Sequence, residues 1–180
     1  MPSKIFWASG AGFITKKSIF EELSGFDEDL FSHMEEIDYH WKCHLMGYQV
    51  ISEPNSIIYH KGGQTLGYHS PFKTYLNHRN SFLLLLSNFS FPLIVILFLP
   101  RFLLEILSGF YELLSGRINN FISIIKSMAW LILHPHIIIK RILFIRKIRK
   151  VKDTEILKLF YKGSIVLSYF ILGKKTYNSL

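Results

Sequence analysis

The sequence predicts a mixed α/β domain over residues 1–70, followed by a mainly helical tail that is associated with a membrane. In the first part, short apolar segments bounded by turn residues alternate with helical patterns, which is typical of an α/β domain. After residue 70 the chain becomes almost wholly apolar and then strongly basic. We therefore divide the tail into apolar membrane-associated helices over residues 71–115 and a basic amphipathic helical segment over residues 116–180.

The first elements lie on either side of a glycine-rich turn. Residues 10–16 (GAGFITK) follow small residues and predict a short strand. Residues 16–26 (KKSIFEELSGF) predict a short helix that Gly25 closes. Residues 26–34 (FDEDLFSHM) carry no regular period, and we expect a loop there.

A second helix is predicted over residues 35–46. Its apolar positions Ile37, Trp41 and Leu45 recur every four residues and therefore lie on one helical face. Gly47 directly after this segment is the usual residue at the end of a helix.

Two short strands are predicted to follow this helix. Residues 48–52 (YQVIS) and 56–60 (SIIYH) are rich in β-branched and aromatic residues. They flank the turn residues 53–56 (EPNS), so we expect a pair of strands joined by this turn.

The segment Phe89–Ser108 is about as long as the roughly 20 apolar residues that cross a bilayer. Arg101 and Glu105 interrupt it, and their spacing of four residues allows an ion pair on one helical face. A true span is one interpretation. An interfacial or re-entrant helix, or a broken hairpin with Pro92 and Pro100 as its kinks, is the other.

A basic amphipathic pattern follows over residues 121–152. Its lysines and arginines alternate with Ile, Leu and Phe, as in a helix that lies on an anionic leaflet, where each cation contributes about 1 kcal/mol. The basic residues at the end of this pattern are Lys140, Arg141, Arg146, Lys147, Arg149, Lys150 and Lys152. Nucleic acid is the weaker alternative, because no nucleic-acid-binding motif precedes the run, and we expect no nucleic acid.

The chain as a whole combines apolar content with positive charge. Hydrophobic residues make up 49% of the 180 residues, yet the formal net charge is +8. This combination favours an anionic membrane surface as partner. The single cysteine, Cys43, excludes an internal disulfide and fits a reducing compartment. Because the first residues contain no apolar signal segment, we expect the cytoplasmic face of the cell membrane.

Three of the 13 acidic residues in the chain are crowded into residues 32–42 (SHMEEIDYHWK). Glu35, Glu36 and Asp38 repel one another, and partial burial would raise the pKa of at least one carboxyl group. A structural interpretation is that these carboxylates complement the dipole at the start of the second helix. A catalytic interpretation comes from a family resemblance.

Residues 8–63 (ASGAGFITKKSIFEELSGFDEDLFSHMEEIDYHWKCHLMGYQVISEPNSIIYHKGG) resemble the C-terminal half of the catalytic domain of glycosyltransferase family 2. The likeness is greatest to rhamnosyltransferase-like members that build surface polysaccharides. Residues 75–89 (YLNHRNSFLLLLSNF) resemble the Tyr and Arg-Asn pattern that leads into a leucine-rich helix there. The resemblance implies the C-terminal portion of a GT-A type nucleotide-diphospho-sugar transferase domain.

The resemblance gives the acidic cluster a role. It implies an inverting transfer in which Glu36, paired with Glu35, is the general base that takes the proton of the acceptor hydroxyl. Glutamate stands where the family usually has aspartate, which adds a methylene to the base. Asp38 would orient the helix start or contact the acceptor, and Lys42 stands where the family often has arginine.

Further binding residues follow from the same resemblance. Small residues at Gly10, Ala11 and Gly12 would let the backbone approach a sugar or acceptor closely. His60, in "YHKGG", would help to hold a divalent cation (Mn²⁺ or Mg²⁺) or the diphosphate, although an ordinary strand-end histidine is the alternative. Contacts to diphosphate or to a lipid-linked acceptor are implied for Tyr75, Arg79 and Asn80. Arg79 is alternatively an interfacial residue that extends toward the headgroups.

The family also has features that this sequence lacks. No Asp-x-Asp element follows a strand, and "DED" at residues 27–29 matches that pattern by letter alone. We therefore expect the C-terminal fragment of an enzyme that transfers sugar from a nucleotide-diphospho-sugar to a polysaccharide or lipid-linked acceptor. Because this fragment lacks the nucleotide-binding half, we expect no donor binding by the isolated chain. The alternative is a non-enzymatic membrane-surface module that has lost donor binding. A metal hydrolase that uses Glu35, Glu36 and His60 is a third, weaker hypothesis.

Overall fold

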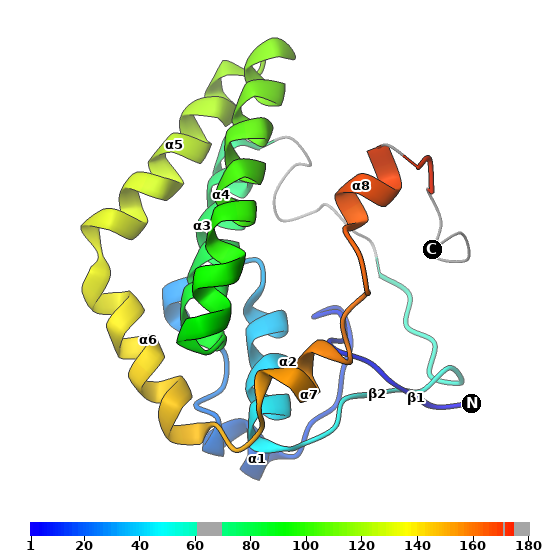
Figure 1. Cartoon of the computed structure of the whole chain (residues 1–180). Coiled ribbons are helices and arrows are strands. Elements are labelled where there is room, and N and C mark those ends of the chain that lie inside the picture. The colour runs from blue at the N-terminus through cyan, green and yellow to red at the C-terminus, as the bar shows by residue number, and fades with distance from the viewer. Residues whose placement is uncertain (61–69, 171, 175–180) are drawn as a thin grey trace.

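The computed structural model describes residues 1–60, 70–170 and 172–174. Helix accounts for 63% of it, and its one sheet has two strands (Figure 1). The predicted α/β class, as part of a GT-A domain, is therefore wrong. The short apolar segments that predicted strands do not find neighbouring strands, and a strand is stable only when its backbone groups are paired.

The sheet joins the N-terminus to the segment that follows the second helix. Strand β1 (Ser3–Lys4) pairs antiparallel with β2 (Ile51–Ser52). The strand predicted within residues 48–52 thus exists over two residues, but its partner is the N-terminal segment. Residues 56–60 and residues 10–16, which were also predicted as strands, form none.

The helices of the first part agree with the sequence patterns. Helix α1 (Lys17–Glu22) is followed by Gly25 at φ 59°, whose N–H donates to the carbonyl of Phe20. The expected loop contains the short 3₁₀ helix η1 (Glu28–Leu30). Helix α2 (Glu35–Met46) has the predicted bounds and ends at Gly47, with φ 93°. Glycine adopts this left-handed conformation without the steric penalty of a Cβ.

The tail folds into a series of helices. These are α3 (Pro71–Asn88), α4 (Phe91–Leu114), α5 (Ile118–Leu133), α6 (Pro135–Ile148), α7 (Asp153–Leu157) and α8 (Ile165–Phe170). Pro92 lies in the first turn of α4, where proline is tolerated, and α4 continues as one helix through Pro100. Of the alternatives for this segment, the broken hairpin with kinks at Pro92 and Pro100 is therefore wrong. Helix α4 is long and apolar enough to cross a membrane, and the mean hydropathy of its most apolar 18 residues is 2.1. Helices α5 and α6 are together long and apolar enough only if they count as one segment, which is bent by 70°.

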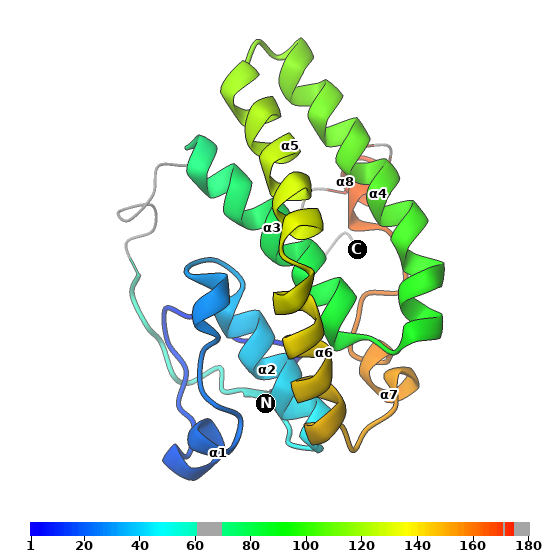
Figure 2. The ribbon, with the colours of Figure 1, turned by 90° about the vertical axis from the view of Figure 1, so that its left-hand side faces the viewer.

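Helices α3 and α6 pack against α2, whereas α4 and α5 extend beyond the N-terminal part (Figure 2). Helix α5 packs against α3 and α4, and α6 packs against α3 and α2. Tyr39, Leu45 and Leu83 are among the largest buried core side chains, each at most 1% exposed. The membrane-like tail and the N-terminal part therefore share one hydrophobic core.

Candidate functional site

The loop before α2 has an unusual backbone. Phe31, His33 and Met34 all have positive φ, at 62°, 66° and 70°. Non-glycine residues rarely adopt this conformation, and each costs free energy that the surrounding structure must supply. The start of α2, where the acidic cluster lies, is thus held in place by a strained loop.

Arg79 of α3 is one of two residues that hold this loop. Its Nη2 donates to the carbonyls of Asp29 and Leu30, at 2.9 Å each, and its Nε donates to Asn80 Oδ1 at 2.9 Å. Its guanidinium also stacks on Trp130, 4.7 Å from the ring centre. Arg79 is 7% exposed, so its donors are used inside the fold and are not directed toward a substrate or a lipid headgroup.

Asn80 is the second residue, and it is completely buried. Its Nδ2 lies 3.0 Å from the carbonyl oxygen of Leu30, 2.9 Å from that of Ser32 and 2.7 Å from that of His33. The amide thus supplies donors to carbonyls of the strained loop, and the Leu30 carbonyl also accepts from the N–H of Ser32. The Arg-Asn pair therefore positions the helix start.

Glu36, like Glu35, is partly accessible in the first turn of α2, whereas Asp38 is buried. Its side-chain carbons lie 3.7 Å from the place where a Cβ on Gly10 would be. Burial raises the pKa of Glu36, and the neighbouring charge of Glu35 adds to this rise. Backbone hydrogen bonds at Glu36, Gly10 and Ile37 oppose it only in part. A carboxylate with a raised pKa is a better proton acceptor.

The glycine-rich turn beside Glu36 separates it from a cavity. The N–H of Gly12 donates to the Ser9 carbonyl at 3.1 Å, which closes the turn. A Cβ at Gly12 would lie 2.1 Å from Ile58 Cδ1, so a larger residue there would require the exposed side chain of Ile58 to move. Gly12 lines a cavity of 600 Å³ whose wall also includes the aromatic side chains of Trp7, Phe13, Tyr39 and His40. Ala11 is exposed, and its N–H donates to Ser9 Oγ.

Glu35 lies in the same turn of α2 but has a different environment. Its Oε2 is buried and has no hydrogen-bond partner within the described part of the chain. Its charge also acts on His33: burial and the charge of Lys73 lower the pKa of that imidazole, and Glu35 raises it in part. Glu35 and Glu36 are therefore adjacent but not equivalent.

Asp38 is completely buried and has three partners. Its Oδ1 lies 2.6 Å from Arg141 Nη2 and accepts a hydrogen bond from Asn88 Nδ2 at 3.0 Å, and its Oδ2 lies 3.2 Å from Lys42 Nζ. Burial alone would raise the pKa of Asp38. Arg141, Lys42 and Asn88 outweigh burial and hold the pKa below its usual value. Asp38 faces the core and does not point to an acceptor.

Lys42 is also enclosed, at 3% exposure. Besides its ion pair with Asp38, its Nζ donates to the carbonyl of Gly25 at 2.8 Å. It thus ties the end of the α1 segment to α2. Lys42 lines a cavity of 390 Å³ together with Asp38 and Arg141, and its ammonium group is engaged by Asp38 and the Gly25 carbonyl.

Arg141 was predicted as one cation of a surface run, and this interpretation is wrong for it. Its side chain is buried between Asp27 and Asp38, and its Nε donates to Ser87 Oγ at 3.2 Å. A sequence signal existed, because Arg141 stands four positions before Ile145 and seven before Ile148, both buried. Arg141 therefore lies on the apolar face of α6.

The predicted metal ligand His60 is exposed, and it is the last described residue before the gap at 61–69. Residues 61–63 of the "YHKGG" motif lie outside the described residues. In the parts of the chain that are described, no group of three His, Cys, Asp or Glu side chains is arranged to hold a metal ion. Within "DED", Asp27 pairs with Arg141 and Asp29 with Lys140, so these carboxylates already have cationic partners.

The structure thus brings Glu36, Glu35 and the Gly10–Gly12 turn together, and it directs Asp38, Lys42 and Arg79 into the fold. His60 is exposed and has no hydrogen bond or ion pair with these residues among the described contacts. Comparisons with models of protein families, with curated proteins and with solved structures find no match to this chain. Any function therefore has to be argued from the chain itself.

We predict that Asp38→Asn strongly destabilises the protein. The change leaves Arg141 and Lys42 buried without a full counter-charge, and breaking a buried ion pair in this way costs about 3–5 kcal/mol. Denaturant unfolding measures the difference. The matched control is Asp29→Asn, which removes the ion pair with Lys140, 3.1 Å away. Because the Lys140 side chain is 73% exposed, this loss should lower the free energy of unfolding by less than about 1 kcal/mol. Similar losses for the two variants would contradict the proposed importance of the buried cluster.

We also predict that Glu36→Gln stabilises the protein at pH 7. Because burial raises the pKa of Glu36, the folded state binds its proton more tightly than the unfolded chain, and ionisation costs stability as pH rises above the ordinary value of 4.5. The gain in melting temperature should disappear below that pH. If Glu36 instead complemented the helix dipole, Glu36→Gln would lower the free energy of unfolding by about 0.3–1 kcal/mol. The control Glu35→Gln should show a loss of this size.

Proposed function

We propose that these residues form the acceptor side of an inverting glycosyltransferase. The donor is a nucleotide-diphospho-sugar, and the acceptor is a cell-surface polysaccharide or a lipid-linked sugar. The observation that carries the proposal is the environment of Glu36: a carboxylate with a raised pKa, beside a glycine turn, at a helix start held by a strained loop. Strain that the surrounding fold maintains is common at functional sites.

The chemistry assigned to Glu36 is proton removal. The acceptor hydroxyl oxygen forms a bond to C1 of the donor sugar while the bond from C1 to the diphosphate oxygen breaks. The carboxylate of Glu36 takes the hydroxyl proton, and the bonding pair leaves with the nucleoside diphosphate. Glu35 keeps the local charge negative and so helps to raise the pKa of Glu36. Attack from the face opposite the leaving group inverts C1.

The described residues do not fit a divalent cation, so no step is assigned to one here. Asp27 and Asp29 are paired with Arg141 and Lys140, and His60 has no neighbouring carboxylates arranged as metal ligands in the described ranges. We expect the nucleotide, with any Mn²⁺ or Mg²⁺, to be bound by a separate nucleotide-binding half. The site of action would be the cytoplasmic face of the cell membrane.

A second candidate is a membrane-surface module without enzymatic activity. The observation in its favour is that Asp38, Lys42 and Arg79 use their polar groups within the fold. Three of the residues that the resemblance assigned to catalysis or binding would then be structural. Such a module would keep the shape of the helix start without transferring sugar.

We predict that Glu36→Gln, in the enzyme assembled with its nucleotide-binding half, lowers turnover by roughly 10²–10⁴-fold and leaves donor binding nearly unchanged. The measurement is transfer of label from a panel of nucleotide-diphospho-sugars to membrane lipids and polysaccharide. Glu35→Gln should have a smaller effect, and Glu36→Asp should keep substantial activity. Unchanged turnover in Glu36→Gln would remove this residue from the mechanism, and absence of transfer by the unaltered enzyme would favour the module.

A further inference from the structure

The outer side of α4 is a large exposed apolar surface. In its most apolar stretch, 11% of the residues are buried inside the protein. Exposed side chains follow one another along the helix: Val95, Ile96, Leu99, Leu103, Leu107 and Phe110 are between 50% and 66% exposed. An uninterrupted apolar surface of this kind usually marks a contact with a membrane or another protein.

The charged residues of α4 are turned away from this surface. Glu105 is 3% exposed and pairs with both Arg101 and His78 of α3. Arg101 also donates to Ser81 Oγ at 2.6 Å. At the end of the helix, Glu112 pairs with Arg117, 2.6 Å away. The charges are thus neutralised within the protein.

The contacts of α4 disfavour a crossing of the bilayer. Its midpoint, at Arg101 and Glu105, lies beside His78 of α3, and the next residue of α3, Arg79, contacts the carbonyl of Asp29. If α4 spanned the membrane, the exposed pair of Asp29 with Lys140 would lie near the bilayer centre, where charges are costly.

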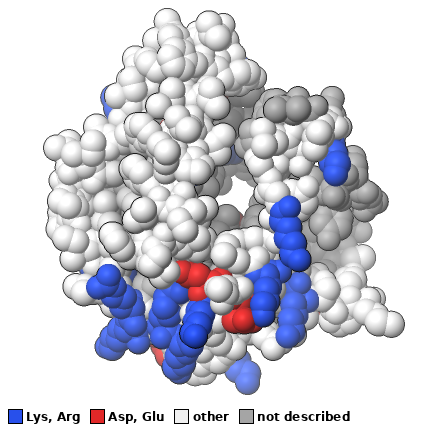
Figure 3. Space-filling model, in the orientation of Figure 1, with Lys and Arg blue, Asp and Glu red and all other residues white. Residues whose placement is uncertain are grey.

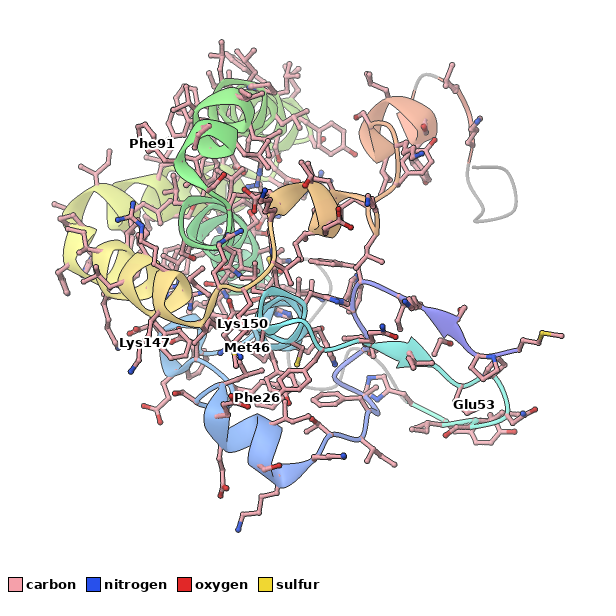
Figure 4. All side chains as sticks on the ribbon, turned by 60° about the horizontal axis from the view of Figure 1, so that its bottom comes forward. Phe26, Met46, Glu53, Phe91, Lys147 and Lys150 are labelled. Atoms are coloured by element: carbon pink, nitrogen blue, oxygen red, sulfur yellow. The ribbon has the colours of Figure 1, made fainter. Side chains whose placement is uncertain are left out.

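A basic edge borders the apolar surface. Figure 3 shows a broad area without charged residues over α4 and α5, with lysine and arginine side chains gathered along its lower end. We define the basic edge as Arg146, Lys147, Lys150 and Lys152, which are exposed and form no ion pair within the described part of the chain. Figure 4 labels Lys147 and Lys150 of this edge, together with Phe91 at the start of α4.

Two contacts fix the basic edge next to the start of α4. Asp153, which directly follows Lys152, accepts a hydrogen bond from the N–H of Ser90 at 2.8 Å. Arg149, within the same segment, donates to the carbonyl of Asn88. The end of the basic segment, from Arg149 to Asp153, is therefore fixed beside the first turn of α4.

We propose that α4 lies in the plane of an anionic bilayer, with its outer side at the boundary of the acyl chains and the basic edge at the lipid phosphates. The binding partner is a lipid surface, because the apolar surface of α4 adjoins the basic edge. This arrangement matches acyl chains that lie next to anionic headgroups. This inference rests on the proposed membrane association but not on glycosyl transfer. It decides between the two interpretations of Phe89–Ser108 in favour of an interfacial helix.

The orientation can be measured with single cysteines. Cys43 is buried, at 5% exposure, so a polarity-sensitive thiol dye should label cysteines introduced at Ile96 or Leu107 selectively. These positions are 11 residues apart on the same side of the helix, about 16 Å along its axis. The probes are vesicles of phosphatidylcholine with and without phosphatidylglycerol. Ile14→Cys, before α1 and fully exposed, is the control outside the surface.

If α4 lies in the plane, quenchers placed at defined lipid depths should give equal, shallow depths for Ile96→Cys and Leu107→Cys, and no quenching for Ile14→Cys. Depths that differ by about 16 Å would show a crossing helix and overturn the inference. A dye signal that depends on protein concentration without vesicles would assign the surface to a second copy of the chain and would also overturn it. Absence of vesicle binding would refute membrane association itself, whatever the transferase assay gives.

The basic edge gives an independent test. Lys150→Ala should weaken binding to vesicles that contain phosphatidylglycerol about fivefold, the equivalent of about 1 kcal/mol per cation near an anionic surface. Binding to phosphatidylcholine alone should not change. Lys4→Ala, on β1, is the charge-matched control and should bind both vesicles like the unaltered protein. Equal losses for Lys150→Ala and Lys4→Ala would remove the basic edge from the docking surface.

Discussion

The buried carboxylate of Asp38 is the constraint on which much of this fold depends. An ionised group without solvent must be paired. One partner, Lys42, lies one turn along α2, and the other two come from distant parts of the chain: Asn88 at the end of α3 and Arg141 of α6. Arg141 also pairs with Asp27 of the loop before α2. One carboxylate therefore joins α2 to the tail helices, so the tail is part of the core.

Because Asp38 is paired in the core, it is not the acidic residue that we propose as the general base. Asp38 is used in the core, whereas Glu36 stays partly accessible, with a pKa that burial raises. The loop before it is kept in a strained conformation by Arg79 and Asn80, whose hydrogen bonds to backbone carbonyls offset the cost of positive φ. Stability and the proposed function thus use different members of one cluster.

The tail also pairs its charges inside the protein, and its outer surface is apolar where the surface of a protein in water is usually polar. Charges within α4 are paired inward, as Glu105 is with Arg101 and His78, whereas large apolar side chains face outward. In water such a surface is unfavourable, so it calls for a partner that accepts apolar side chains. The basic run is divided between two roles. Arg141 pairs with carboxylates in the core, whereas the exposed cations that follow it can bind anionic groups outside the protein.

The sequence by itself determined the features that depend on neighbouring residues: the bounds of α2, its end at Gly47, the acidic cluster at its start, and the apolar length of α4. Helical period and glycine conformation are local, so pattern reveals them. Only the tertiary structure decided the fold class, the strand partner of β2, and the burial of Asp38 and Arg79. These depend on contacts between distant residues, such as the pair that joins Arg141 to Asp38 across 103 positions, and no local pattern encodes which cation meets which carboxylate.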